Sequence, residues 1–358
     1  MSQSEHAERR RRIARELGQA RLDAMLVSSL ANIRYLTGFT GSAGMLLLEP
    51  YATVLITDPR YSFQAIEQTD CAVRIARHSI VAEVARCLAQ RGVRRLGFEP
   101  AHLSFDQYSQ LRDKCTHLLP LPGLVERARM VKTESEIDLI RRASAITSEV
   151  FSAILPLIRP GVSELDLAAE IEYRMRKLGA DGPAFPPIVA SGLNSALPHA
   201  SPSSKILSFN ELVLIDMGAE LAGYSSDMTR TAWIGSHPEP QIRQMYSAVL
   251  EAQQAAIGAV RAGVTAAAID RAARQSLKAK GLEKAFLHAS GHGLGLEIHE
   301  PPRLGRPERT KLKSGMAITV EPGVYFKELG GIRIEDTVIV ASEGAVILTT
   351  ANKDFLTL

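Results

Sequence analysis

The stretch IRPGVSELDLAAEIEYRMRKLGA (residues 158–180) returns later in the chain as VRAGVTAAAIDRAARQSLKAKGL (residues 260–282). Both copies carry a turn glycine, a hydroxyl residue placed to cap the next helix, and a closing glycine: Gly161, Ser163 and Gly179 in the first, and Gly263, Thr265 and Gly281 in the second. Each copy then leads into a β-like hairpin that carries acidic residues. The repetition therefore predicts a region built from two related halves.

The first acidic hairpin is expected in ELVLIDMGAELAGYSSDMTRTAWIG (residues 211–235). Asp216 interrupts an apolar run, and Asp227 follows the turn. If the turn is centred between Leu221 and Ala222, the two aspartates lie directly opposite each other, with Cβ atoms about 4.5–5.5 Å apart. This hairpin would then present two carboxylates side by side.

The second acidic hairpin is expected in MAITVEPGVYFKELGGIRIEDTVIV (residues 316–340), where Glu321 and Glu335 flank a turn near residues 328–331 in the same manner. Four carboxylates thus fall on paired strands, two from each half. Such carboxylates repel one another and resist removal from water, so the cluster requires a strong positive charge. Two divalent cations would supply it. Considered singly, each acid is as readily explained as a solvated strand residue.

A glycine-rich stretch, SGHGLGLEIHE (residues 290–300), adds His292 and His299. The helical zinc motif of proteases places its histidines four residues apart, and this spacing with its intervening glycines does not match that motif. Four oxygen ligands and one imidazole favour hard or borderline ions, so manganese or cobalt is preferred, with zinc possible. We therefore expect two divalent metal ions as cofactors.

The bulk properties set limits on the class of protein. A chain of 358 residues suits two domains. The net charge of +3 predicts no nucleic-acid partner, and the lack of any run of about 18 apolar residues predicts no membrane span. Cys71, Cys87 and Cys115 are isolated in sequence and form neither a disulfide framework nor a cysteine zinc site. We expect a cytoplasmic protein.

The first part of the chain shows a different pattern. Short apolar runs at residues 23–29, 44–50, 52–58 and 94–100 alternate with helical patterns such as residues 80–91. This alternation predicts an α/β domain. A long amphipathic helix is then expected after Lys132, with Thr133 as its N-cap and Glu136 completing a capping box. We therefore predict two domains, residues 1–128 and 129–358.

The ordered set of metal-ligating residues resembles a known family. Asp216, Asp227, His292, Glu321 and Glu335, with VEPGVY and IRIEDT around the last two, are similar to the ligands of the dinuclear metallopeptidases with the pita-bread fold. The stretches NIRYLTGFTGS (residues 32–42) and TDPRY (residues 57–61) resemble their creatinase-like N-terminal domain. The resemblance implies an α/β creatinase-like domain followed by an α+β pita-bread catalytic domain with an internal pseudo-twofold repeat.

The same resemblance implies a role for each residue. Asp227 and Glu335 would bridge the two metals, Asp216 would complete one shell, and His292 with Glu321 would complete the other. Glu321 would also move a proton during catalysis, beside the catalytic histidines His199 and His299. Substrate contacts would come from His288, Arg303, Tyr325 and Arg333. Packing or ion pairing alone remains an alternative for Tyr325 and Arg333.

Within the family, the chain is most similar to the Xaa-Pro peptidases. The expected function is a metal-dependent aminopeptidase P, which cleaves the Xaa-Pro bond at the N-terminus of proline-containing peptides. The alternative is an Xaa-Pro dipeptidase, or prolidase. A methionine aminopeptidase would lack an N-terminal domain of this size, whereas a creatinase or a non-catalytic binding module with this fold would have lost ligands. Relatives of this kind imply a homodimer.

Overall fold

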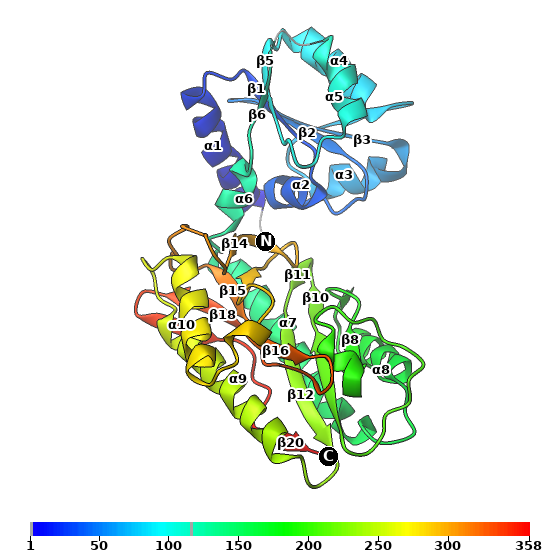
Figure 1. Cartoon of the computed structure of the whole chain (residues 1–358). Coiled ribbons are helices and arrows are strands. Elements are labelled where there is room, and N and C mark those ends of the chain that lie inside the picture. Colours follow the sequence, from blue (N-terminus) through cyan, green and yellow to red (C-terminus); the bar gives the residue numbers. More distant parts are fainter. Residues whose placement is uncertain (1–2, 115–116) are drawn as a thin grey trace. The chain divides into compact units, whose positions relative to one another are not determined.

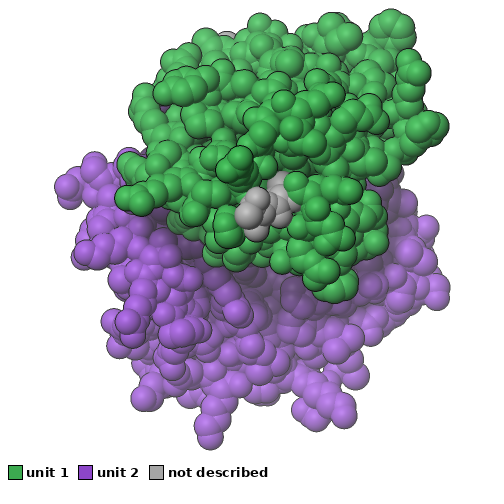
Figure 2. Space-filling view, turned by 90° about the horizontal axis from the view of Figure 1, so that it is seen from above, with its two compact units in different colours: residues 1–129 green, residues 130–358 purple. Residues whose placement is uncertain are grey.

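The computed structural model describes residues 3–114 and 117–358, so Cys115 lies outside the described residues. The chain divides after Arg129 into two compact units, residues 1–129 and 130–358, which Figure 2 colours separately. The boundary predicted after residue 128 differs from this division by a single position. No helix among the described residues is both long and apolar enough to cross a membrane.

Unit 1 (residues 1–129) contains one six-stranded sheet in the order β4-β3-β2-β1-β5-β6. In that order the strands are Ala72–Ile75, Thr53–Thr57, Met45–Leu48, Ala24–Val27, Arg95–Phe98 and His117–Pro120. The helices are α1 (Gln3–Gln19), α2 (Leu30–Thr37), α3 (Ser62–Gln68), α4 (Ile80–Arg91), α5 (Phe105–Arg112) and α6 (Leu124–Arg129). All residues of β1 are buried, because helices cover both faces of the sheet (Figure 1).

The strands of unit 1 follow the sequence pattern closely. The four predicted apolar runs become β1, β2, β3 and β5, and the predicted helix becomes α4 with the same bounds. Strand β1 pairs in parallel with β5 and antiparallel with β2, so the sheet is mixed. The α/β character expected from the alternation is confirmed.

Unit 2 (residues 130–358) consists of two halves of similar construction (Figure 1). In the first half, α7 (Glu134–Ile154) and α8 (Glu164–Lys177) accompany β8 (Ile188–Ser191), β9 (Glu211–Met217) and β12 (Met228–Ile234). In the second, α9 (Pro240–Ala259) and α10 (Ala266–Ala279) accompany β13 (His292–Gly293), β15 (Ala317–Val320) and β18 (Asp336–Ala341). The sheets have the orders β20-β12-β9-β8 and β14-β13-β15-β18-β19.

Short strands extend these two sheets or form two small separate sheets, β11-β10-β7 and β16-β17. They are β7 (Gly182–Pro183), β10 (Ala219–Leu221), β11 (Tyr224–Ser225), β14 (Glu300–Arg303), β16 (Gly323–Phe326), β17 (Gly330–Arg333), β19 (Gly344–Ile347) and β20 (Leu356–Thr357). The first-half helices pack on their sheet through residues such as Ile171 and Ile215. The second-half helices do so through residues such as Ile269 and Ile318. Each half thus covers its own sheet, and the two sheets contact each other at β12 and β18.

The predicted repeat is visible in matching backbone hydrogen bonds. Gly161 N donates to Leu207 O (3.2 Å), and Gly263 N donates in the same way to Leu312 O (2.8 Å). Both turn glycines have positive φ, 92° and 90°. Ser163 caps α8 with a full capping box, whereas the Thr265 side chain makes no capping hydrogen bond to α10. The internal duplication is confirmed, with one cap lost in the second copy.

Candidate metal centre

The register of the first acidic hairpin corrects our prediction. Asp216 pairs with Thr229, and Leu221 pairs with Tyr224 across the turn, so the turn residues are Ala222 and Gly223. Both have positive φ, 49° and 79°, as a two-residue hairpin turn requires. The turn therefore comes one residue later than predicted, and Asp216 and Asp227 are diagonal neighbours on one face instead of directly opposed.

In the second acidic hairpin the two glutamates pair as predicted, but the turn spans residues 327–329, slightly earlier than the predicted turn near residues 328–331. Val320 pairs with Asp336 on one side of the two acids, and Gly323 pairs with Arg333 on the other. Glu321 and Glu335 therefore stand opposite each other, in the gap between the two ladders. Their strands are interrupted there, so both side chains can turn toward the first hairpin.

The acids and His292 converge on one point. The Nε2 atom of His292 lies 3.5 Å from Asp227 Oδ2 and 3.6 Å from Glu321 Oε1. Asp227, His292 and Glu335 each offer a ligand atom, and these atoms lie within 4.8 Å of one another. His292 donates its Nδ1–H to Gly293 O (3.0 Å), which leaves the Nε2 lone pair directed at the acids.

The hydrogen bonds of the acids leave oxygens facing the centre. Arg333 Nη2 donates to Asp216 Oδ2 (2.6 Å), and Thr229 Oγ1 donates to Glu335 Oε2 (2.6 Å). The other oxygens, Asp216 Oδ1, Asp227 Oδ1 and Glu335 Oε1, are buried without a hydrogen-bond partner among the described residues. A buried carboxylate oxygen without a donor is costly, and a cation removes that cost. The residues present therefore fit a divalent metal centre.

Electrostatics support the same conclusion. Burial, followed by repulsion from the neighbouring acids, raises the pKa of Asp227 and Glu335 well above their usual values. Burial also raises the pKa of Glu321 to about 8, although Arg333 opposes the shift. Burial and then His299 lower the pKa of His292 to about 4, so its imidazole is neutral at pH 7. A bound cation would reverse the penalty on the acids.

A chain of hydrogen bonds extends from the acids to the pocket wall. Arg333 Nη1 donates to the Tyr325 hydroxyl (2.7 Å), which in turn donates to His288 Nε2 (2.9 Å). The His288 Nδ1–H is used by Ala289 O (2.7 Å), and burial lowers the pKa of His288 to about 4. Arg333 thereby links Asp216 to a neutral histidine that faces the pocket.

The centre forms the floor of a pocket of about 660 Å³. The predicted site residues that line this pocket are His199, Asp216, Asp227, His288, His292, His299, Arg303, Glu321, Arg333 and Glu335. Tyr325 is not among the lining residues: it is 6% exposed and lies behind the pocket wall, between Arg333 and His288. Apolar residues complete the wall: Phe185, Ile188, Pro198, Ile298 and Pro301.

The two remaining histidines come from different loops. His199 follows the 3-10 helix at residues 192–196, whereas His299 immediately precedes β14. The ring of His299 packs edge-on against His292, with centroids 4.3 Å apart. Burial, followed by the charge of His199, lowers the pKa of His299. Both side chains are exposed to the pocket, as a group that contacts substrate must be.

Three threonines that the sequence analysis did not single out hold the acids in place. Thr229 bonds to Glu335, as described above, and Thr337 Oγ1 donates to Asp227 O (2.8 Å) and accepts from Asp227 N (3.2 Å). Thr319 Oγ1 accepts from His292 N (3.1 Å). A sequence signal was available, because DMT and EDT each place a threonine two residues after Asp227 or Glu335, on the same strand face.

A two-halved α+β unit that carries a buried acid and histidine cluster on the floor of a pocket defines a metal-dependent hydrolase. The chain belongs to metallopeptidase family M24, which its residues 138–342 match, and residues 9–131 match the creatinase/prolidase N-terminal domain. The predicted fold, a creatinase-like domain followed by a pita-bread domain, is thereby confirmed, as is the assignment to the metallopeptidases.

Individual relatives are similar over nearly their whole length. The structure of an Xaa-Pro dipeptidase from Bacillus anthracis has 40% identity and a TM-score of 0.95, covering 99% of this chain and 100% of that one. An X-Pro aminopeptidase from Thermotoga maritima has 34% identity and a TM-score of 0.91, with 98% and 99% covered. The Xaa-Pro dipeptidase of Pyrococcus furiosus is 35% identical, with 98% and 99% covered.

Proposed function

We propose that this chain is an Xaa-Pro dipeptidase, a prolidase that uses two divalent metal ions. The observation that carries the proposal is the convergence of four acids and His292 beneath a pocket that also holds the guanidinium of Arg303. Our sequence analysis placed aminopeptidase P first and prolidase second. Relatives named Xaa-Pro dipeptidase support the second more strongly. Aminopeptidase P remains the competing assignment, because a similar structure is named an X-Pro aminopeptidase.

The five ligand residues divide between two ions. The family resemblance assigns Asp227 and Glu335 to both ions, and each offers a buried oxygen that has no hydrogen-bond partner among the described residues. Asp216 would complete the coordination shell of one ion, and His292 and Glu321 would complete that of the other. When bound, the ions supply Lewis acidity and activate water at neutral pH. Manganese or cobalt fits this oxygen-rich set, and zinc is possible.

The remaining chemistry falls to the side chains around the ligands. Glu321 is the group placed to accept a proton from the attacking water and return it to the leaving nitrogen. His199 and His299 line the pocket above the ligands and would donate hydrogen bonds to the charge that develops on the substrate carbonyl oxygen. Arg333 fixes Asp216, and it holds Tyr325 and His288 in one orientation.

The pocket also suits the two ends of an Xaa-Pro dipeptide. An Xaa-Pro bond has no N–H, so its recognition depends on shape and apolar contact with the ring. The apolar wall provides that contact. Arg303 pairs with His292 on the adjacent strand and projects from the pocket lining, where it can bind the carboxylate that follows proline in a dipeptide.

Substrate comparison tests the assignment directly. With added manganese, Ala-Pro should be cleaved faster than Ala-Pro-Yaa tripeptides, and Met-Yaa peptides and creatine should not be cleaved. Arg303→Gln should raise KM for Ala-Pro by about 10- to 100-fold, since a charge-assisted hydrogen bond contributes about 1.5–3 kcal/mol. The same change should leave Ala-Pro amide unaffected, and Arg309→Gln on the exposed neighbouring loop is the control. Faster cleavage of tripeptides would establish the aminopeptidase instead.

The roles of the ligands are tested separately. His299→Ala should keep near-normal metal content and lower turnover by about 10²–10⁴-fold, the usual effect of losing a positioned acid or base. Asp227→Ala should lose metal as well as activity. Atomic absorption on dialysed protein measures the metal. Full activity with two metals in Asp227→Ala would contradict the ligand assignment.

We further propose that the chain acts as a homodimer in the cytoplasm. The resemblance to dimeric relatives supports the first point, and free Cys71 and Cys87 are compatible with a reducing compartment. Light scattering of the purified protein and fractionation of the host cell test these two statements.

A further inference from the structure

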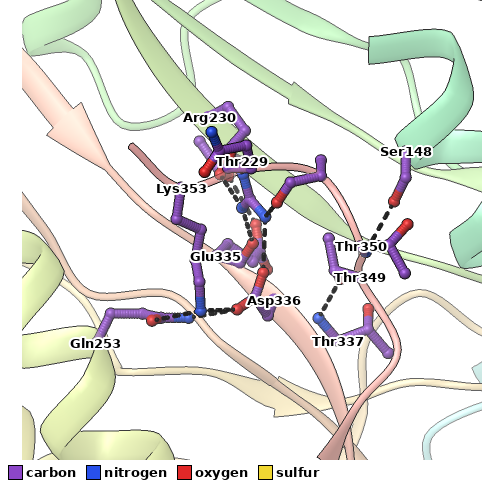
Figure 3. A network of polar contacts seen from close by, with 12 residues as sticks. Ser148, Thr229, Arg230, Gln253, Glu335, Asp336, Thr337, Thr349, Thr350 and Lys353 are labelled. Carbon is purple, nitrogen blue, oxygen red and sulfur yellow. Dashed lines mark hydrogen bonds and ion pairs between the residues drawn. The ribbon is translucent and has the colours of Figure 1, made fainter. Parts of the chain in front are cut away.

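The C-terminal segment of residues 348–355, here called the strap, crosses between the two halves of unit 2. It joins β19, which pairs with β18 in the second sheet, to β20, which pairs with β12 in the first. Figure 3 shows that its polar contacts gather behind Glu335 and its neighbours. The strap therefore contacts the strand segments that carry the two proposed bridging acids.

The first anchor of the strap is Arg230, which is 2% exposed. Its Nη2 donates to Ala351 O (2.8 Å), and its Nε donates to Asn352 O (3.0 Å). Its Nη1 donates to Glu335 O (2.6 Å) and to the carbonyl of Thr229 (2.9 Å). One guanidinium thus connects the strap backbone to the backbone of a ligand residue.

The second anchor is Asp336, which follows Glu335 in the chain. The side chain of Asp336 is fully buried. Its Oδ1 accepts from Arg230 Nη2 (2.8 Å), and its Oδ2 accepts from Lys353 Nζ of the strap (2.6 Å) and from Gln253 Nε2 (2.8 Å). A buried carboxylate needs this many donors to remain charged. The side chain of Lys353 therefore holds the position next to Glu335 from the side opposite the metal pocket.

The third anchor reaches Asp227. Thr349 Oγ1 accepts from Thr337 N (3.0 Å), and Leu348 N donates to Thr337 O (2.9 Å). The Thr337 hydroxyl in turn bonds to both the N–H and the C=O of Asp227. Thr350, the next residue of the strap, is exposed, and its backbone N–H donates to Ser148 Oγ in α7 (3.1 Å).

We propose that the strap positions Asp227 and Glu335 and so sets the affinity of the site for its metal ions, with Thr349 and Lys353 as positioning residues. The proposal rests on the ligand assignment made above. Both acids lie at breaks between strands, so the backbone hydrogen bonds of a β-ladder do not hold them in position. Groups behind metal ligands commonly change metal affinity by about 10- to 100-fold when removed. Here the strap provides those groups for both halves at once.

The test is a Mn²⁺ titration of the full-length metal-free protein, without substrate, well below its melting temperature. Thr349→Val keeps the shape of the side chain and removes the oxygen, and it should weaken Mn²⁺ binding by about 10-fold or more. Thr349→Ser should restore it. Thr350→Val is the matched control, one residue along, and should bind as the wild type does. A purely structural role would lower the melting temperature of the metal-free protein without changing the affinity of the folded protein.

Wild-type affinity in a folded Thr349→Val protein would overturn the proposal. If that variant does not fold, Lys353→Met takes its place, with Lys353→Arg as the rescue, and wild-type affinity in Lys353→Met is then the overturning result. The wild-type and Thr350→Val titrations report on the proposed metal centre itself. If the wild type and Thr350→Val fail to bind Mn²⁺, the proposed function is refuted. If both bind Mn²⁺ and the strap variants bind it with the same affinity, only the proposed role of the strap is refuted.

Discussion

Glu321→Gln should stabilise the metal-free protein at neutral pH, although it removes a proposed ligand. Burial raises the pKa of Glu321 from its usual 4.5 to about 8. The native state therefore holds a proton that the unfolded chain releases between these two pH values. Because the unfolded state binds fewer protons in that window, stability falls as pH rises through it. A glutamine at this position carries no such penalty.

The size of the effect follows from that shift. At pH 7 the unfolded carboxyl is about 2.5 pH units above its pKa, and each unit corresponds to 1.36 kcal/mol, so the penalty is about 3 kcal/mol. Near pH 5 the same calculation gives less than about 1 kcal/mol. Below the usual pKa both states are protonated, and the wild type and Glu321→Gln should be equally stable.

Denaturant unfolding in a chelator at pH 5 and pH 7 measures this difference. Glu328→Gln is the matched control, because Glu328 is exposed at the tip of the same hairpin and should change stability little. With manganese at about 1,000 times Kd the order should reverse, since metal that binds only the native wild type stabilises it by about 4.1 kcal/mol, more than the penalty of about 3 kcal/mol. A metal-free Glu321→Gln protein that is less stable than wild type at pH 7 would refute the electrostatic argument.

Two further predictions concern the scaffold of the site. Glu164 on α8 is fully buried and accepts hydrogen bonds from the loop before β9, and although burial opposes it, these donors hold the pKa of Glu164 below its usual value. Glu164→Gln should therefore lower the free energy of unfolding by about 1.5–3 kcal/mol at pH 7. This difference should fade as pH falls through the native pKa, because the wild type then loses the same stabilisation. The surface variant Glu170→Gln should lower the free energy of unfolding by less than about 1 kcal/mol, and urea unfolding across this pH range measures both variants. A Cβ added at Gly218 would lie 1.9 Å from a neighbouring carbonyl oxygen, so Gly218→Ala should lower the melting temperature and the metal content together, while Gly258→Ala in α9, with open space around it, should do neither.

The convergence of the candidate metal ligands was largely predictable from the sequence, because these residues are recognised by type and order. Asp216 and Asp227 stand in one hairpin, and Glu321 and Glu335 in another, so pairing each hairpin brings its own acids together. The register of the first hairpin was less predictable. Its turn depends on which residues accept positive φ, and Gly223 moved the turn one position further than hydrophobic pattern alone indicated.

What the sequence did not reveal are contacts between segments far apart in the chain. The sequence did not indicate Arg230 as a site residue. A single arginine in a strand is expected at the surface unless its hydrogen-bond acceptors are known. In the structure its acceptors come from residues 335–336 and 351–352. For Tyr325 the sequence left substrate contact and core packing open, and in the structure its hydroxyl bonds to Arg333 and His288 behind the pocket wall.

The pairing of threonines with the proposed bridging acids would place the proposed metal centre between the two halves. Thr229, two residues after Asp227, bonds to the Glu335 carboxylate, and Thr337, two residues after Glu335, bonds to the Asp227 backbone. Each half therefore holds the acid of the other, as a pseudo-twofold axis requires. Neither half alone could orient its own acid, because the stabilising hydroxyl belongs to its partner. We therefore expect the proposed ligand set to form only once both halves have folded and docked.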